Sequence, residues 1–288
     1  MDRPLITVFT PTYNRAQLLP RLFKSLCQQA DHNFEWLIVD DGSTDGTESV
    51  VNGFQAETFA VRYVWKENGG KHTAYNLALK EARGEFFFCV DSDDFLAPDG
   101  IRLISEALRP ATGLCAYKAS VGGRLLSTVF PNGAESTTTF DLYEKLGCRG
   151  EYAFIYPTHI ARQVPFPVFS GERFVTESVV FDQLDQHCPV LLLPEVITIC
   201  EYQTSGYSAD TNRLMHENPA GYCLYYMQRI DRVSSLPQRI AAAGKYRCFG
   251  RMAGSQRSIY NGNYRLLVSL CAPLGILFEV YYHLIRGI

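Results

Sequence analysis

Short apolar runs alternate with amphipathic segments through the first part of the chain. The runs occupy residues 5–9, 34–39, 61–65 and 86–90, and each has the length of one strand. Between them, apolar residues recur every three or four positions, as in Leu18, Leu22 and Leu26, and this spacing predicts helices. Strands that alternate with helices over short links are typical of an α/β fold with a mostly parallel central sheet flanked by helices. Further runs at 114–118, 124–129, 151–156, 190–193 and 196–201 predict additional strands.

Polar residues follow each of the first four runs at its carboxyl end. Tyr13 follows the first run, Asp41 the second, Lys71 the third, and Asp91 and Asp93 the fourth. Because ligands of open α/β sheets bind beyond the carboxyl ends of the strands, we expect these side chains on one rim. An aromatic ring, an acceptor for a ring N–H, a positive charge and a pair of carboxylates together describe a pocket for a nucleoside diphosphate and a metal.

The acidic stretch Asp91-Ser92-Asp93-Asp94 has two interpretations when it is taken alone. Carboxylates this close repel one another unless a cation lies among them, and oxygen ligands suit Mg²⁺ or Mn²⁺. The same residues also fit an acidic turn that caps the helix after Pro98, since aspartate favours both turns and helix starts. The neighbouring motifs favour the metal site.

Two common phosphate-binding motifs are missing from the places where they would be needed. A dinucleotide fold requires GxGxxG after the first strand, where this chain has TPTY at residues 10–13. The sequence GGKH at 69–72 lacks both the leading glycine and the final hydroxyl of a P-loop. Neither a dehydrogenase nor a kinase-type phosphate loop is therefore supported.

Taken in order, the motifs resemble those of the family 2 glycosyltransferases, which have the type A, Rossmann-like fold. The matching pieces are TPTYNR at 10–15, VDDGSTDGT at 39–47, NGGK at 68–71, Asn76, and the DxD motif within DSDD at 91–94. The resemblance implies an inverting, metal-dependent, hexosyltransferase-like enzyme that uses a nucleotide-activated sugar, often a UDP-sugar. It also implies a divalent cation, Mn²⁺ or Mg²⁺, as cofactor.

The resemblance assigns expected roles to individual residues of the rim. Pro11 and Tyr13 would lie along the uracil, and Asp41 would accept a hydrogen bond from its N3–H. Asp91 would lie beside the ribose, and Asp93 would ligate the metal that bridges the diphosphate. Two further donor-binding residues are Lys71 and Ser92.

The expected catalytic base is Glu177. The family has its catalytic carboxylate at the start of a helix, often as the second residue of an acidic pair, and here Thr176 precedes Glu177. Thr176 is a suitable N-cap, so Glu177 would lie in the first helical turn. An acid favoured there by the helix dipole is the alternative interpretation of Glu177. Asp182 competes for the same role, although it lies about a turn and a half further along the helix.

The C-terminal region differs in charge and pattern from the rest. We expect a catalytic domain over residues 1–218 and a helical extension over 219–288. Residues 229–265 contain eight basic side chains and one acidic one, and residues 264–288 are mostly apolar around Pro273 and Gly275. This pattern favours an interfacial helix or a re-entrant anchor held on anionic lipid. A helix docked on the catalytic domain is the alternative.

Several features remain open at the level of sequence. The loop at 202–208 fits either a lid over the diphosphate or an exposed loop, and His72 and His216 fit either extra metal ligands or structural side chains. A nucleotidyltransferase is a rival, although its glycine-rich basic loop is absent from the N-terminal region. A non-catalytic sugar-nucleotide-binding scaffold of the same fold is another.

Composition and net charge indicate the size of the core, the possible partners and the redox environment. A chain of 288 residues with 47% hydrophobic content can bury a large core, and its net charge of −3 argues against nucleic acid as a partner. The nine cysteines are scattered without a CxxC pair, which indicates thiols in a reducing cytosol. The expected partners are a nucleotide-sugar donor, a glycan or lipid-linked acceptor and the inner face of the cytoplasmic membrane, in bacterial surface polysaccharide synthesis.

Overall fold

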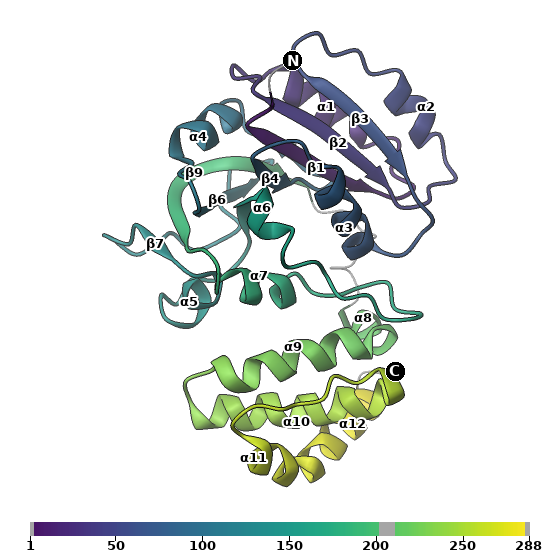
Figure 1. Ribbon diagram of the computed structural model, residues 1–288, viewed down its shortest axis with the longest axis vertical. Helices are drawn as coiled ribbons and strands as arrows, with labels where there is room; N and C mark the ends of the chain where they lie inside the picture. Colours follow the sequence, from purple (N-terminus) through teal and green to yellow (C-terminus); the bar gives the residue numbers. More distant parts are fainter. Residues whose placement is uncertain (1–2, 202–210, 286–288) are drawn as a thin grey trace. The chain divides into compact units, whose positions relative to one another are not determined.

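The computed structural model describes residues 3–201 and 211–285, which form two compact units (Figure 1). The sheet unit comprises Met1–Pro165 and Gln183–Gln203, and the helical unit comprises Phe166–Asp182 and Thr204–Ile288. This division differs from a single boundary after residue 218, because the segment 166–182 packs with the C-terminal helices. The loop at 202–208, a candidate lid, lies outside the described residues.

The sheet unit is built on a single sheet with the strand order β3-β2-β1-β4-β8-β6-β9-β5. Its first four strands are β1 (Ile6–Thr12), β2 (Phe34–Asp40), β3 (Ala60–Trp65) and β4 (Phe86–Cys89). These strands are mutually parallel and coincide with the four apolar runs of the sequence. The α/β class with a parallel sheet is thereby confirmed.

The other strands extend this parallel block. They are β5 (Phe95–Leu96), β6 (Gly113–Ser120), β7 (Ser136–Thr137), β8 (Tyr152–Pro157) and β9 (Val190–Cys200). Strand β8 runs antiparallel between β4 and β6, and β9 runs parallel to β6. The two runs at 190–193 and 196–201 form one strand, β9, whose pairing with β6 shifts register near Tyr117. The strand predicted at 124–129 was wrong, because that segment makes only isolated bridges at Leu125 and Ser127.

Helices flank the sheet (Figure 1), and the first three lie between the apolar runs, as the periodicity predicted. They are α1 (Leu19–Cys27), α2 (Thr47–Asn52), α3 (Lys71–Glu81), α4 (Gly100–Ala107), α5 (Thr139–Glu144) and α6 (Thr158–Ala161). Strand β1 is buried on both faces: Ile6 and Val8 join the cluster that contains Leu22 of α1, while the ring of Phe9 meets Tyr75 of α3 at 5.7 Å. A central strand packed on both sides gives the loops at its carboxyl end a rigid support.

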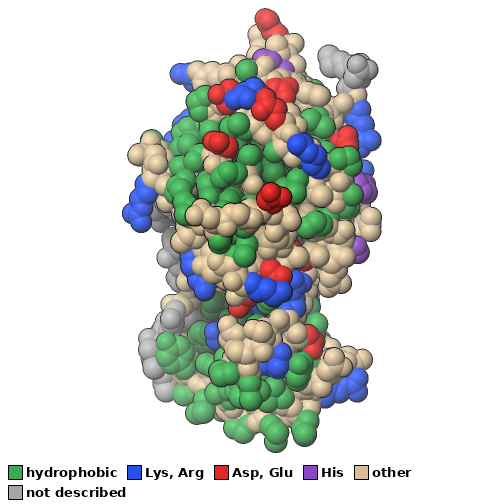
Figure 2. Space-filling model, turned by 90° about the vertical axis from the view of Figure 1, so that its left-hand side faces the viewer, with side chains coloured by type: hydrophobic (Ala, Val, Ile, Leu, Met, Phe, Trp, Pro, Cys, Tyr) green, Lys and Arg blue, Asp and Glu red, His purple; other side chains and the backbone are tan. Residues whose placement is uncertain are grey.

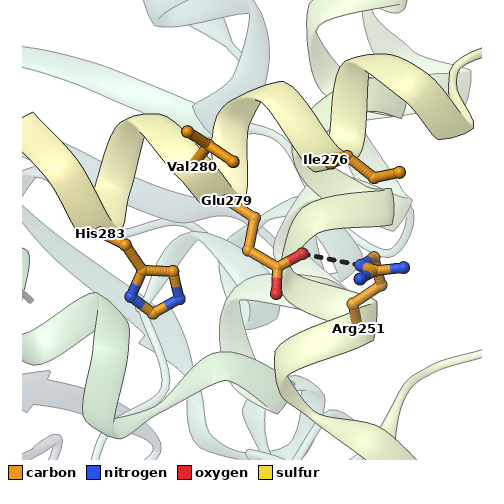
Figure 3. A pocket seen from close by; sticks show the side chains of 5 residues that line it. All are labelled: Arg251, Ile276, Glu279, Val280 and His283. Carbon is orange, nitrogen blue, oxygen red and sulfur yellow. Dashed lines mark hydrogen bonds and ion pairs between the residues drawn. The ribbon is translucent and has the colours of Figure 1, made fainter.

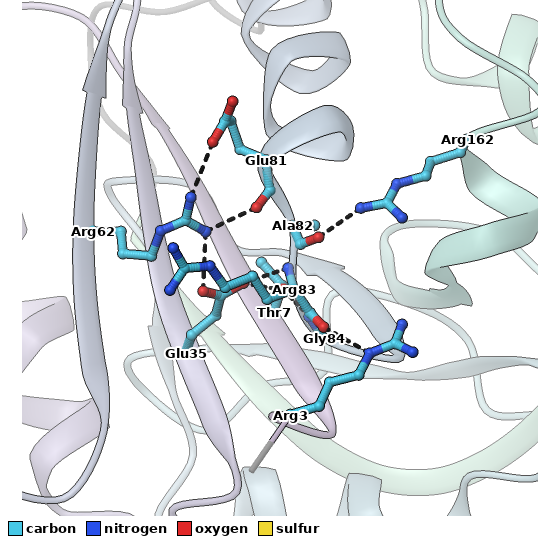
Figure 4. A network of polar contacts seen from close by, with 9 residues as sticks. All are labelled: Arg3, Thr7, Glu35, Arg62, Glu81, Ala82, Arg83, Gly84 and Arg162. Carbon is cyan, nitrogen blue, oxygen red and sulfur yellow. Dashed lines mark hydrogen bonds and ion pairs between the residues drawn. The ribbon is translucent and has the colours of Figure 1, made fainter. Parts of the chain in front are cut away.

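A buried carboxylate fastens the amino ends of the strands (Figure 4). Glu35 accepts hydrogen bonds from the Thr7 hydroxyl and the Arg83 backbone N–H, each at 2.7 Å, and forms an ion pair with Arg62 at 3.1 Å. The Thr7 hydroxyl in turn accepts a bond from the Gly84 N–H at 2.8 Å. These contacts tie β1, β2, β3 and the start of β4 together at the end of the sheet opposite the candidate site.

The helical unit has its own core. Its helices are α8 (Thr211–Glu217), α9 (Pro219–Arg232), α10 (Leu236–Met252), α11 (Arg265–Leu270) and α12 (Ala272–Ile285), and α7 (Ser178–Leu184) begins in it. Cys223 and Ile230 of α9 pack with Ala243 and Phe249 of α10. Among residues 3–201 and 211–285, no helix is both long and apolar enough to cross a membrane.

The segment 166–182 is fastened to α9 by two polar side chains. Glu172 accepts hydrogen bonds from the N–H groups of Ala220 and Gly221 at 2.6 and 2.9 Å, which satisfies donors at the start of α9. The side-chain oxygen of Asn218 accepts from the backbone N–H groups that follow Glu172, those of Arg173 and Phe174. The segment that carries Glu177 is therefore part of the helical unit.

Candidate functional site

Asp41 joins the loop after β2 to the loop after β3. Its carboxylate is almost fully buried and accepts hydrogen bonds from the N–H groups of Gly69 and Gly70 at 3.0 and 2.7 Å. Lys66 forms an ion pair with the same carboxylate at 2.6 Å. Buried charges need paired and hydrogen-bonded surroundings, and these three donors supply them. The sequence predicted Asp41 at this rim but gave no role to Lys66.

The backbone beside Asp41 requires glycine. Gly42 has φ +88°, and a Cβ at this position would lie 2.8 Å from the backbone nitrogen of Asn68. Asn68 donates a hydrogen bond from its amide to the carbonyl oxygen of Asp41 at 2.8 Å. The two loops therefore approach too closely for a larger residue at position 42.

Side chains of the DGSTD motif fasten the loop after β1. The N–H of Asn14 donates to the Ser43 hydroxyl at 2.8 Å, and the Asn14 side chain accepts from the Thr44 N–H at the same distance. Asp45 accepts from the N–H of Ala16 at 3.0 Å. Tyr13, next to Asn14, is nearly half exposed, whereas Pro11 is buried at the end of β1. An open aromatic ring on a fixed loop suits stacking on a planar base.

Lys71 connects the loop after β3 to the acidic stretch after β4. Its ammonium group lies 2.8 Å from a carboxylate oxygen of Asp91. Burial alone would raise the pKa of Asp91, but the charges of Lys71, Lys118 and Arg15 lower it below its usual value. Asp91 is therefore ionised at neutral pH.

Arg15 closes the ring of contacts between the loops. Its guanidinium lies 3.0 Å from the Asp93 carboxylate and donates to the Ser92 hydroxyl at 3.3 Å. Arg21 donates to the backbone oxygen of Asp93 at 2.6 Å. The loop after β1 thus meets the loop after β4, and all four loops are linked in a circuit. The sequence contains Arg15 within its TPTYNR motif, but nothing in the spacing predicts its pairing with Asp93.

A second layer of charge lies behind the acidic stretch. Lys118 of β6 forms an ion pair with buried Asp94 at 3.3 Å. Burial raises the pKa of Asp94, and Lys118 partly offsets that effect. Burial also opposes the charge of Lys118, but Asp94, Cys200 and Asp91 raise its pKa above the usual lysine value. Sequence reasoning missed Lys118, because one lysine in an apolar strand carries no motif.

The acidic stretch offers a donor set that fits a divalent cation of the Mg²⁺ type. Asp91 and Asp93 provide carboxylate oxygens, and each is balanced by a basic side chain at about 3 Å. Within the described parts of the chain, no group of three or more His, Cys, Asp or Glu side chains could hold a metal. A cation bound through one or two carboxylates and substrate phosphates does not require such a group.

The two histidines considered as extra ligands belong to different units of the chain. His72 is buried in α3. The ring of His216 in the helical unit contacts that of His283, with centroids 6.0 Å apart.

Glu177 lies just before α7 within the helical unit. Its carbonyl accepts hydrogen bonds from the N–H groups of Val180 and Phe181 at 3.0 and 2.9 Å, and α7 begins at the next residue, so Glu177 directly precedes the helix and does not lie in its first turn. Burial, followed by the charge of Glu177, raises the pKa of Tyr222 to about 12. The competing acid, Asp182, is buried and lies 3.5 Å from Arg229. Asp182 therefore has a structural partner within the helical unit.

Comparison with known proteins agrees with these motifs. Residues 7–129 match the family model described as Glycosyl transferase family 2. A chondroitin synthase of Pasteurella multocida (strain Pm70) is 37% identical over 115 residues, which make up 40% of this chain and only 12% of that protein.

Two solved structures share the fold. The crystal structure of S. aureus TarS 1–349 in complex with UDP-GlcNAc has a TM-score of 0.64 at 18% identity, covering 96% of this chain and 91% of that one. The mannosyltransferase PcManGT from Pyrobaculum calidifontis, in complex with GDP-Man and Mn²⁺, has a TM-score of 0.56 at 19% identity, with coverages of 97% and 88%. At these identities the likeness concerns the fold, which is the expected type A fold. Residues 7–129, which carry the ordered motifs, are therefore similar to the family 2 glycosyltransferases.

Proposed function

We propose that this protein transfers a sugar from a UDP-sugar to a glycan or lipid-linked acceptor, with inversion, in the synthesis of a bacterial surface polysaccharide. The observation that carries the proposal is the circuit of contacts among the four loops, from Asn14 to Ser43, Asp41 to Gly70, Lys71 to Asp91, and Asp93 to Arg15. Binding of UDP-GlcNAc by TarS and the polysaccharide named for the chondroitin synthase support the choice of donor and pathway class.

The base of the nucleotide would bind between the first two loops. Tyr13 supplies an exposed ring beside the buried Pro11. Asp41 accepts three hydrogen bonds from the protein, and an ionised carboxylate has about four acceptor positions. One acceptor position thus remains for a ring N–H such as that of uracil.

The diphosphate would lie against the third and fourth loops. Asp93 would hold a Mn²⁺ or Mg²⁺ ion, and such an ion, when bound, neutralises charge that develops on the leaving diphosphate. Lys71 contributes a second positive charge, while Asp91 and Ser92 would contact the ribose. The Mn²⁺ in the PcManGT complex supports a divalent metal as cofactor.

Glu177 is proposed as the general base. It would remove the proton of the acceptor hydroxyl while that oxygen forms a bond to the anomeric carbon and the bond to the diphosphate breaks. A single displacement inverts configuration, so an α-linked donor yields a β-linked product. A positioned base typically contributes about 10²–10⁴-fold to such a rate.

We also propose the cytoplasmic side of the cell, at the inner face of the cytoplasmic membrane, as the place of reaction. Nucleotide sugars and a lipid-linked acceptor meet there. The basic and apolar composition of residues 229–288 supports this location.

A panel of nucleotide sugars with the purified full chain tests the proposal. With Mn²⁺ or Mg²⁺, one donor should raise the melting temperature and release UDP slowly by hydrolysis. A ligand at 100 times its Kd adds about 2.7 kcal/mol to stability. Release of pyrophosphate would indicate a nucleotidyltransferase, and UDP binding without any turnover would indicate a scaffold. The absence of both binding and release for all donors would refute the proposal.

A further inference from the structure

Helix α12 has apolar side chains both on the face that packs against α10 and on its exposed surface. Leu274 and Phe278 lie against Gly244 of α10, where a Cβ would come within 2.7–2.8 Å of their side chains. The ring of Tyr282 packs on Phe249 of α10, with centroids 5.5 Å apart. These contacts define the face of α12 that belongs to the core of the helical unit.

The remaining surface of α12 continues into that of α11 and is also apolar. We call this surface the α11–α12 face. Its exposed side chains are Leu266, Leu270, Ile276, Leu277, Val280 and Tyr281. Leu266 is 75% exposed, Leu270 70% and Leu277 65%. Hydrophobic side chains gather over the C-terminal helices at the lower end of the view in Figure 2. Water-soluble proteins rarely leave so many large apolar side chains together without a partner.

Basic side chains border this face. Arg247 of α10 lies beside Gly275, and exposed Arg265 begins α11. Figure 3 shows Ile276 and Val280 beside a shallow pocket in which Glu279 pairs with Arg251 at 2.7 Å. Because Arg251 balances Glu279, the charge that borders the face is positive.

The described part of α12 is too short to span a bilayer. Its 14 residues span about 21 Å at 1.5 Å per residue, less than the roughly 30 Å of a hydrocarbon core. A short helix with an apolar surface and bordering arginines suits the boundary between headgroups and acyl chains, where it lies in the plane of the membrane.

We propose that the α11–α12 face is a membrane-docking surface that inserts its leucines into bilayers containing anionic lipid, with Arg247, Arg251 and Arg265 at the headgroups. A second copy of the chain is the competing occupant of the face. A two-fold interface would bring the same positive border against itself, and this repulsion favours the anionic lipid. The inference goes beyond the proposed chemistry and depends only on the helical unit.

Vesicle sedimentation with the full chain tests the proposal. The protein should bind vesicles of an equal mixture of phosphatidylcholine and phosphatidylglycerol more strongly than vesicles of phosphatidylcholine alone. Raising salt from about 0.1 M to about 1 M shortens the Debye length from about 10 Å to about 3 Å and should reduce this difference. Substituting Arg265→Gln should weaken binding to the mixed vesicles by about fivefold.

A matched pair of substitutions tests the apolar contribution. Leu277→Glu should weaken binding to the mixed vesicles by about tenfold or more, because it removes a leucine that would be buried in the bilayer and adds a charge of the same sign as the lipid. Val129→Glu, at a residue of the sheet unit that is also 65% exposed, should leave binding unchanged. Circular dichroism should report the same helix content for both variants.

Three results would overturn the proposal: no binding of the wild type to mixed vesicles, equal binding by Leu277→Glu, or a concentration-dependent dimer that Leu277→Glu dissociates while lipid has no effect. Hydrolysis of a nucleotide sugar without acceptor provides an independent readout. If vesicle binding fails and hydrolysis persists, only the docking surface is refuted. If hydrolysis fails and vesicle binding persists, only the proposed chemistry is refuted.

Discussion

At the rim of the sheet unit, charged side chains meet opposite charges, whereas along α11 and α12 of the helical unit apolar side chains meet water. Asp41, Asp91 and Asp93 each lie within 3.0 Å of a basic group, while Leu266, Leu270 and Leu277 are mostly exposed. Because each of these carboxylates already has a basic partner, a charged ligand that binds at the rim would replace one ionic contact with another. The α11–α12 face exposes several large apolar side chains, and we assign it to a membrane surface.

The residues proposed for donor binding and for proton removal are also divided between the two units. The donor-binding residues belong to the sheet unit, and Glu177 belongs to the helical unit. Substitution of Glu177 should therefore lower turnover and leave UDP binding intact, whereas substitution of a donor-binding residue should change both.

The largest expected effect is that of Glu177→Gln. The amide keeps the shape of the side chain but cannot accept the acceptor's proton, so turnover should fall by about 10²–10⁴-fold. UDP affinity, measured by calorimetry, should stay at the wild-type value because the rim is untouched. Glu217→Gln, on the surface of α8, is the control and should keep full turnover. Unchanged turnover in Glu177→Gln would remove this residue from the mechanism.

Asp93→Asn should lower turnover and also abolish the effect of metal on UDP binding. Loss of the carboxylate removes the proposed metal ligand, and turnover should fall by about 10²–10³-fold, since several kcal/mol of charge stabilisation depend on the ion. In calorimetry, UDP should bind this variant equally with and without Mn²⁺, whereas the wild type should bind more tightly with it. Binding to mixed vesicles should not change. An equal metal effect in wild type and variant would contradict the role of Asp93.

The sequence alone identified Glu177 and Asp93, but only the structure shows which residues contact them. The apolar runs predicted the four successive strands β1 to β4 along the chain. The motifs after these runs predicted the loops that carry Tyr13, Asp41 and Lys71. The pairing of Arg15 with Asp93 joins residues 78 positions apart, and no local pattern encodes it.

The misjudged elements have a related cause. Residues 124–129 have the composition of a strand but find only isolated bridging partners, since tertiary pairing outweighs propensity there. The segment 166–182 joins the start of α9 through hydrogen bonds of the Glu172 and Asn218 side chains, whose partners are distant in sequence. Local periodicity does not report contacts of this kind.

Gly84→Ala tests the rigid support of the rim (Figure 4). A Cβ at this position would lie 2.3 Å from the backbone nitrogen of Thr7, so β1 and β4 would have to separate. We expect a loss of about 1–3 kcal/mol in the free energy of unfolding, measured by urea denaturation. Gly46→Ala, where the added methyl meets nothing within 4 Å, is the matched control and should change stability by less than about 0.5 kcal/mol. Equal stability of the two variants would argue against close packing at the start of β4.

Asp91→Asn should have the smallest effect, and pH reveals it. The folded-state pKa of Asp91 is lowered, chiefly by Lys71 acting against burial. Its stabilising contribution is therefore present above the unfolded value of about 3.9 and is lost as pH falls through the lower folded value. The side chain is one-third exposed, so screening should keep this contribution below about 1 kcal/mol. Denaturation curves of wild type and variant should differ at pH 7 and converge in acid. A difference that grows as pH falls would show that Lys71 does not stabilise the ionised carboxylate.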